Sequence, residues 1–140
     1  MKQEDRQLLL KDLCARLPFG ICANLPNHHL VSHKYIIDDI NIQNGWTNGL
    51  LDCVGRIQIY GAKIEDIKPY LRPLSSMTEE EVKEFYDVEC IDAKVAYIKP
   101  TWNWHFTING IDWLNANHFD YRGLIPKCLA IKAPKDMYKL

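Results

Sequence analysis

The sequence contains none of the short motifs that mark the large nucleotide-binding, hydrolase and zinc-protease families. No G-x-G-x-x-G, Walker loop, G-x-S-x-G or H-E-x-x-H occurs in its 140 residues. Their absence makes a protein without catalytic activity the favoured prediction, although an enzyme that uses other residues stays open.

The cysteines are too scattered to organise a structure. There are five, an odd number, and no two form a C-x-x-C pair: Cys14, Cys22, Cys53, Cys90 and Cys128. This pattern argues against both a disulfide framework and a four-ligand zinc site. We therefore expect the thiols to be reduced.

Net charge and long apolar runs are also lacking. The formal net charge is −1, which gives no electrostatic attraction to nucleic acid or to a membrane. No stretch approaches the roughly 18 apolar residues of a membrane span, and the N-terminus lacks the apolar core of a signal peptide. The composition predicts a soluble cytoplasmic protein, and the length predicts a single domain over residues 1–140.

The first segment with clear periodicity is residues 3–17, which we expect to form an amphipathic helix ended by Pro18. Its apolar face consists of leucines that follow helical spacing: Leu9, Leu10, Leu13 and Leu17. The charged residues, Asp12 and Arg16 among them, are assigned to the rest of the helix.

Strand-like segments rich in β-branched and aromatic residues follow at 19–25, 30–37, 54–60 and 62–67. Two Asn-Gly pairs at 44–45 and 48–49 predict a long exposed loop that contains Trp46. Short connections between the strands favour a curled antiparallel meander, open or closed into a small barrel.

Thr78 and Glu81 have the spacing of a capping box, which predicts a helix that begins after Thr78. Pro69 and Pro73 keep the residues before it extended. The remaining predicted elements are a strand, a helix and a short strand: 91–99, a helix from near Ile111, and 128–131. The fold class is therefore α+β, with a helix–turn–strand at the C-terminus.

The segment HFDYRG, residues 118–123, combines groups that occur in active sites. Asp120 and Gly123 occupy the first and fourth positions of a type I turn, and His118 complements the dipole at the end of the preceding helix. The alternative makes His118 a general base oriented by Asp120, with Arg122 holding an anion. Because that alternative needs side chains that converge on one pocket, we favour the turn.

Tryptophans are the best candidates for a binding surface. Trp102 and Trp104 share one face of an extended segment, and an exposed Trp46 would suit a ligand ring or a protein partner. The alternative is that Trp102, Trp104 and Trp113 cover one end of the core. The predicted binding residues are Trp46, Trp102, Trp104 and His105.

Neither the histidines nor the basic tail predicts a site. His28, His29 and His33 resemble a metal cluster, but in a strand His29 and His33 would stand about 13 Å apart, too far to share one ion. We expect no metal and no cofactor. Five cations oppose Asp136 in the tail: Arg122, Lys127, Lys132, Lys135 and Lys139. Such a tail is more typical of solvated surface than of nucleic-acid binding.

Three stretches resemble known sequences: LLLKDLCARLPFG at 8–20, IKPYLRPLSSMTEEEVKEF at 67–85 and IDWLNANHFDYRGLIPKCLAIKAP at 111–134. They resemble short uncharacterised proteins of Bacteroides-group gut bacteria and of their phages and prophages. That set has no established activity, so the resemblance transfers no catalytic residue. It implies a mobile-element accessory protein that acts in the host cytoplasm on host machinery or host defence.

We therefore expect a non-catalytic binding protein of phage or mobile-element type, whose partner is a host protein or a small nucleotide-type ligand. The alternative is a small hydrolase or nuclease that uses His118 and Asp120. A third reading, a single-stranded nucleic-acid binding module, is disfavoured by the near-zero net charge.

Overall fold

The computed structural model describes residues 1–25, 34–52, 57–89 and 106–138. Its helices and strands are α1 (Gln3–Arg16), β1 (Ile21–Asn24), β2 (Lys34–Asn41), β3 (Trp46–Asp52), β4 (Ile57–Lys63), β5 (Lys68–Leu71), α2 (Glu79–Glu89), α3 (Ile108–Ala116) and β6 (Ile131–Lys132). Short 3-10 helices follow α1, β4 and β5: η1 (Leu17–Phe19), η2 (Ile64–Asp66) and η3 (Leu74–Ser76). The α+β prediction is confirmed; the strand predicted at 91–99 lies outside the described residues.

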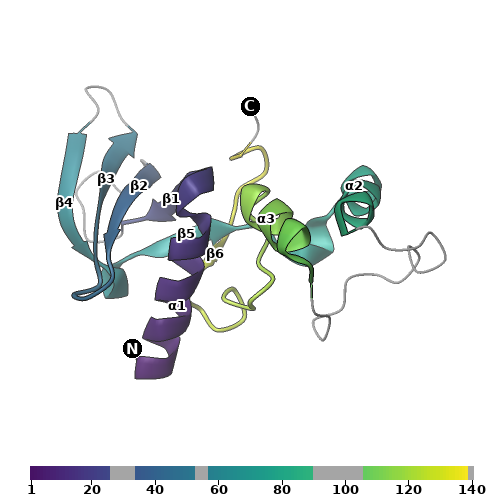
Figure 1. Ribbon diagram of the computed structural model, residues 1–140. Helices are drawn as coiled ribbons and strands as arrows, with labels where there is room; N and C mark the ends of the chain where they lie inside the picture. The colour runs from purple at the N-terminus through teal and green to yellow at the C-terminus, as the bar shows by residue number, and fades with distance from the viewer. Residues whose placement is uncertain (26–33, 53–56, 90–105, 139–140) are drawn as a thin grey trace.

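The strands form one mixed sheet in the order β4-β3-β2-β1-β5-β6. β1, β2, β3 and β4 pair with their sequence neighbours as an antiparallel meander. The chain then returns to the other side of the meander, where β5 pairs antiparallel with β1. β6 adds a parallel edge strand beside β5, and because it does not pair with β4 at the other end, the sheet is open rather than closed into a barrel (Figure 1).

The main core lies between α1 and one face of this sheet. Leu9 and Leu13 of α1 are fully buried, together with Ile21, Tyr35 and Leu51 of the strands. The register pairs Tyr35 with Leu51, so alternate residues of neighbouring strands face the same helix. Each fully buried Leu or Ile contributes about 1.5–3 kcal/mol, which makes α1 the element that fixes the sheet.

A second core lies between α2 and α3, away from the meander (Figure 1). Aromatic rings dominate it: the Phe85 and Trp113 centroids are 5.4 Å apart, and Trp113 stacks on Phe119 at 5.7 Å. Trp113 is therefore a core residue. Phe119 belongs to this second core and Leu124 to the main core, so the segment between them joins the two.

Both later helices begin with a side-chain cap. In α2 the N–H of Thr78 donates to Glu81 Oε1, and the N–H of Glu81 donates to Thr78 Oγ1, each at 3.1 Å. The capping box is thus confirmed. α3 begins at Ile108, earlier than predicted, because the hydroxyl of Thr107 accepts the N–H of Gly110 and caps the helix there.

The long exposed loop predicted around Trp46 is wrong. The side-chain oxygen of Asn41 accepts the N–H groups of Gln43 and Asn44, which closes a short turn at the first Asn-Gly pair. β3 then begins at Trp46, which pairs with Lys63 of β4. One Asn-Gly pair therefore makes the hairpin turn, as the dipeptide favours.

The second Asn-Gly pair lies inside β3, beside irregularities in its pairing with both neighbours. A Cβ at Gly49 would lie 2.0 Å from the carbonyl oxygen of Ile36 on β2, so only glycine allows this close approach. The side chain of Asn48 bridges to Asp39 and to the N–H of Gly61. This pair serves strand packing rather than a turn.

Two further strand predictions need correction. The predicted strand 62–67 is not separate, because β4 runs through Gly61 to Lys63 and η2 follows. The predicted strand 128–131 shrinks to the two residues of β6, because the chain still turns at Cys128, whose φ is +60°. In both places the apolar residues were identified correctly, but a turn of the backbone sets where the strand begins or ends.

The end of α3 has the hydrogen bonds of a Schellman motif with His118 in the position usually taken by glycine. The N–H of Phe119 donates to the carbonyl of Leu114, and the N–H of His118 donates to that of Asn115. His118 has φ +62°, a left-handed conformation in which histidine is more frequent than most residues. This helix end therefore sets the direction of the chain into residues 118–123.

The turn at 124–129 repeats this motif with Cys128 in the left-handed position. The N–H of Leu129 donates to the carbonyl of Leu124, and the N–H of Cys128 to that of Ile125. Cys128 is exposed, so its side chain contributes little packing. The site has the backbone geometry that favours glycine.

We expect Cys128→Gly to raise the free energy of unfolding by about 0.5–1 kcal/mol, because glycine adopts the left-handed conformation without steric cost. Urea unfolding monitored by circular dichroism measures the change. Cys128→Ala is the matched control and should give no gain. Equal stabilities for the two variants would contradict the assignment.

Candidate functional site

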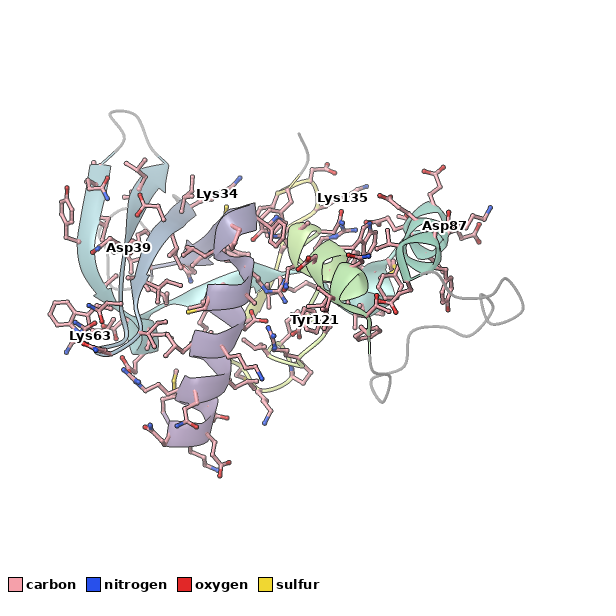
Figure 2. The ribbon with its side chains drawn as sticks, in the orientation of Figure 1. Lys34, Asp39, Lys63, Asp87, Tyr121 and Lys135 are labelled. Atoms are coloured by element: carbon pink, nitrogen blue, oxygen red, sulfur yellow. The ribbon has the colours of Figure 1, made fainter. Side chains whose placement is uncertain are left out.

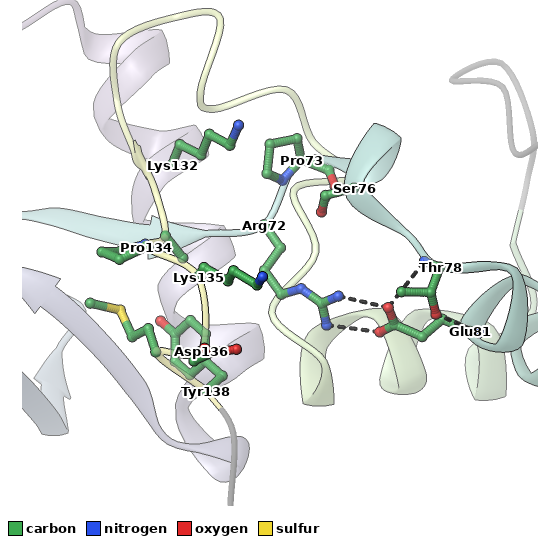
Figure 3. Close-up of a pocket in the computed structure, with 12 residues that line it drawn as sticks. Arg72, Pro73, Ser76, Thr78, Glu81, Lys132, Pro134, Lys135, Asp136 and Tyr138 are labelled. Atoms are coloured by element: carbon green, nitrogen blue, oxygen red, sulfur yellow. Dashed lines mark hydrogen bonds and ion pairs between the residues drawn. The ribbon is translucent and has the colours of Figure 1, made fainter.

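A pocket of about 540 Å³ opens between the C-terminal segment and the start of α2 (Figure 3). Arg72, just after β5, lies between these two walls. The described lining residues come from three short segments: Arg72 and Pro73; Ser76, Thr78 and Glu81; and Lys132 to Tyr138. The pocket thus lies where the edge of the sheet meets the helical core.

Arg72 is held more firmly than an ordinary surface arginine. Its backbone N–H donates to the carbonyl of His118, and its carbonyl accepts the N–H of Asp120, each at 2.8 Å. Its guanidinium carbon lies 4.2 Å from the centroid of the Phe119 ring, in cation–π geometry. The backbone and the head group are therefore both fixed by the segment 118–120.

Glu81 binds the guanidinium of Arg72 with both carboxylate oxygens, at 2.7 and 2.8 Å. The two side chains are 27% and 19% exposed, so this pair is shielded more than a surface ion pair. Burial alone would raise the pKa of Glu81, but hydrogen bonds from Arg72 and Thr78 outweigh it and lower that pKa below its usual value. Glu81 is therefore ionised at neutral pH.

The opposite wall is a C-terminal segment fastened to the sheet. The N–H of Ala133 donates to the carbonyl of Leu71, and the N–H of Met137 donates to that of Pro134. The hydroxyl of Tyr138 then donates to the carbonyl of Tyr70 at 2.6 Å. These bonds hold the wall in place across β5.

The lining carries more positive than negative charge that is free to meet a ligand. Lys132 and Lys135 are exposed, and neither forms an ion pair with another described residue. Among the described lining residues, Glu81 is neutralised by Arg72, and Asp136 is the other carboxylate beside the two lysines. The sequence showed this basic tail but not the pocket that it lines.

The three candidate catalytic side chains go to three different places. Asp120 accepts the N–H groups of Leu124 and Ile125 with its two carboxylate oxygens, at 2.8 and 2.9 Å. Its carboxylate, rather than the backbone bond of a type I turn, closes this loop. Arg122 donates to Asp12 of α1. Asp120 and Arg122 therefore have structural partners outside the pocket.

His118 lies behind the pocket wall rather than on it. Its ring stacks on Tyr138 with centroids 3.6 Å apart and planes at 14°. The residue is 7% exposed, and its Nδ1 has no hydrogen-bond partner among the described residues. Burial, with the nearby charges of Arg16 and Arg72, lowers the pKa of His118 to about 4. It is neutral at physiological pH, and no hydrogen bond joins its side chain to that of Asp120.

A buried charge cluster at this junction was missed by the sequence reasoning. Asp12 and Arg16 are both fully buried, and Arg16 donates to Asp12 through Nε and Nη2. Arg16 Nη2 also donates to the carbonyl of Phe119 at 2.6 Å. At 100° per residue both side chains point within about 60° of Leu9 on the helix. That proximity to the leucine face was the available signal.

The predicted tryptophan surface is described only in part. Trp46 is 45% exposed, and its ring lies over Gly61 of β4, where a Cβ would come within 2.9 Å of it. Trp102, Trp104 and His105 lie outside the described residues. Trp46 is therefore a partly exposed strand residue, remote in the sheet order from the pocket beside β5 and β6.

Within the described ranges, no cluster of three or more histidine, cysteine, aspartate or glutamate side chains has the geometry to hold a metal ion. Among the same residues, no helix combines the length and apolar character needed to cross a membrane. Comparison of the chain with protein-family models, curated proteins and solved structures gave no match.

We expect the free energy of unfolding to fall by about 3 kcal/mol between pH 6.5 and pH 4. In this range the unfolded chain binds a proton at His118 and the folded chain does not, since the folded pKa is about 4. Urea unfolding at several pH values measures the slope. In His118→Asn, which tolerates the left-handed backbone but does not titrate, most of the slope from pH 6.5 to 5 should disappear. An unchanged slope would contradict the assignment.

Proposed function

We propose that this protein is a non-catalytic binding protein and that its pocket takes a small phosphate-bearing ligand of the nucleotide type. The observation that carries the proposal is the cavity of about 540 Å³ lined by Arg72, Lys132 and Lys135. Ligand sites in proteins typically measure about 300–1,000 Å³, which covers a mononucleotide.

The chemistry of the lining suits a phosphate group with an apolar neighbour. Arginine offers planar paired donors and lysine offers a mobile point charge, the two common ways of binding phosphate. Pro73, Pro134 and Met137 add apolar surface beside these cations, on which a base or a ribose ring can rest. The combination supports a ligand with one anionic end and one flat or apolar end.

The pocket supports binding better than catalysis. None of its described lining residues is a histidine or a cysteine, and the hydroxyl of Ser76 donates to the carbonyl of Pro73. A hydrolase that uses His118 and Asp120 would need those side chains to meet. Asp120 instead binds two backbone N–H groups, and His118 stacks on Tyr138. This geometry argues against the hydrolase alternative.

A host protein is the second candidate partner, favoured by apolar side chains exposed around β4. Tyr60 is 77% exposed, Ile42 65% and Trp46 45%. Large exposed apolar side chains suit a protein contact. The mobile-element context, with action on host machinery or defence, rests on the sequence resemblance and belongs to the same proposal.

We expect purified protein to bind AMP, ADP or a cyclic nucleotide, seen as a rise of several degrees in Tm at 100 times the Kd. Lys132→Ala/Lys135→Ala should weaken that binding about tenfold in isothermal titration calorimetry, because it removes two cations from the pocket. Lys11→Ala/Lys63→Ala removes the same charge elsewhere and should leave the Kd within about twofold.

A flat response of the wild type to every nucleotide in the panel would contradict the small-ligand proposal. A protein partner that binds the surface around Trp46 would then be the favoured proposal. Equal losses in the two double-lysine variants would show that net charge, rather than this pocket, attracts the nucleotide.

A further inference from the structure

The strongest anion-binding group of the pocket is already occupied by a carboxylate of the chain itself. Glu81 makes both of the paired hydrogen bonds that the guanidinium of Arg72 offers along one edge, at 2.7 and 2.8 Å. This fork-to-fork arrangement is the same one that arginine uses for the carboxylate or phosphate of a ligand. Figure 3 shows the two groups facing each other at the start of α2.

We propose that Glu81 acts as an internal competitor for Arg72, and that a phosphomonoester ligand displaces it to bind the guanidinium. This inference rests on the proposed function, since it names how the same pocket accepts its ligand. The ligand class follows from the geometry: a dianionic phosphate offers two oxygens at the spacing of the carboxylate that it replaces and carries one charge more.

Arg72 is built to change partners without moving. Its backbone is fixed by hydrogen bonds to His118 and Asp120, and its guanidinium rests on the ring of Phe119. These contacts remain when Glu81 leaves, because none of them involves Glu81. The arginine therefore presents a preorganised donor pair, which reduces the entropy lost on binding a ligand.

Glu81 has a second contact that couples the exchange to α2. Its Oε1 also accepts the N–H of Thr78 in the capping box, at 3.1 Å. When Glu81 turns away from Arg72, this bond weakens, and the first turn of α2 loses part of its cap. Ligand binding would thus weaken the N-terminal cap of α2, next to the pocket.

The two free lysines explain how a ligand competes with an intramolecular partner. Lys132 and Lys135 lie on the facing wall and form no ion pair with a described residue. They attract a phosphate, and neither forms an ion pair with Glu81, which is tethered to α2. A dianion that bridges Arg72 and these lysines therefore has contacts that Glu81 lacks.

The test compares Glu81→Gln with wild type for AMP binding, by isothermal titration calorimetry at fixed ionic strength. Glutamine keeps the shape and the cap to Thr78 but loses the charge that holds Arg72. We expect the affinity for AMP to rise about fivefold or more. Glu65→Gln is the matched control, since Glu65 pairs with Arg6 outside the pocket. It should change the affinity less than twofold.

A measurement on the wild type covers the case in which Glu81→Gln fails to fold. Titration of the Glu81 carboxyl by carbon NMR, with and without saturating AMP, should show its pKa rising toward the ordinary value when Arg72 is taken by phosphate. An unchanged pKa in the presence of bound AMP would overturn the proposal.

The outcomes separate the two claims. If wild type binds AMP and Glu81→Gln binds it no tighter, the competitor role is wrong while the binding function stands. If only Glu81→Gln binds AMP, the competitor role is supported and the wild-type function is wrong. If neither binds any nucleotide, both proposals fail together.

Discussion

One buried carboxylate, that of Asp12, holds the sheet half of the molecule to the helical half. It accepts hydrogen bonds from Arg16 of the same helix and from Arg122 of the distant 118–123 segment. Arg16 extends the link to the carbonyl of Phe119. Figure 2 shows Tyr121 at this junction between α1 and α3, where its ring faces both arginines. Removal of this buried carboxylate would leave Arg16 buried without a counter-charge, which is strongly destabilising.

The pocket depends on this link through a short chain of contacts. The pinned segment 118–120 supplies the backbone partners that fix Arg72 and the Phe119 ring that supports its guanidinium. The same segment supplies His118, which backs Tyr138 and so the C-terminal wall. Residues that look catalytic in the sequence therefore frame the pocket, and Arg72, Lys132 and Lys135 are the cations that line it.

The sequence predicted the parts that depend on local patterns. The leucine spacing of α1 and the capping box at Thr78 both reflect contacts within a few residues. It did not predict the Gly49 approach to Ile36 or the burial of Asp12 and Arg16, because both depend on residues more than ten positions away. The pocket was missed for the same reason: Arg72, Glu81 and Lys132 come from segments that only the return of β5 and the parallel pairing of β6 bring together.

The most direct test of this account is a double-mutant cycle on the buried pair, with Asp12→Asn, Arg16→Met and the double variant compared by urea unfolding. Asp12→Asn should lower the free energy of unfolding by about 3–5 kcal/mol, because it leaves the buried guanidinium of Arg16 uncompensated. Arg16→Met should lower it less, by about 1.5–3 kcal/mol, because Arg122 still donates to Asp12. The double variant should lose at least about 2 kcal/mol less than the sum of the two single losses. Small, additive losses below about 1 kcal/mol each would show that the junction is held by packing alone and would contradict the central role of the pair.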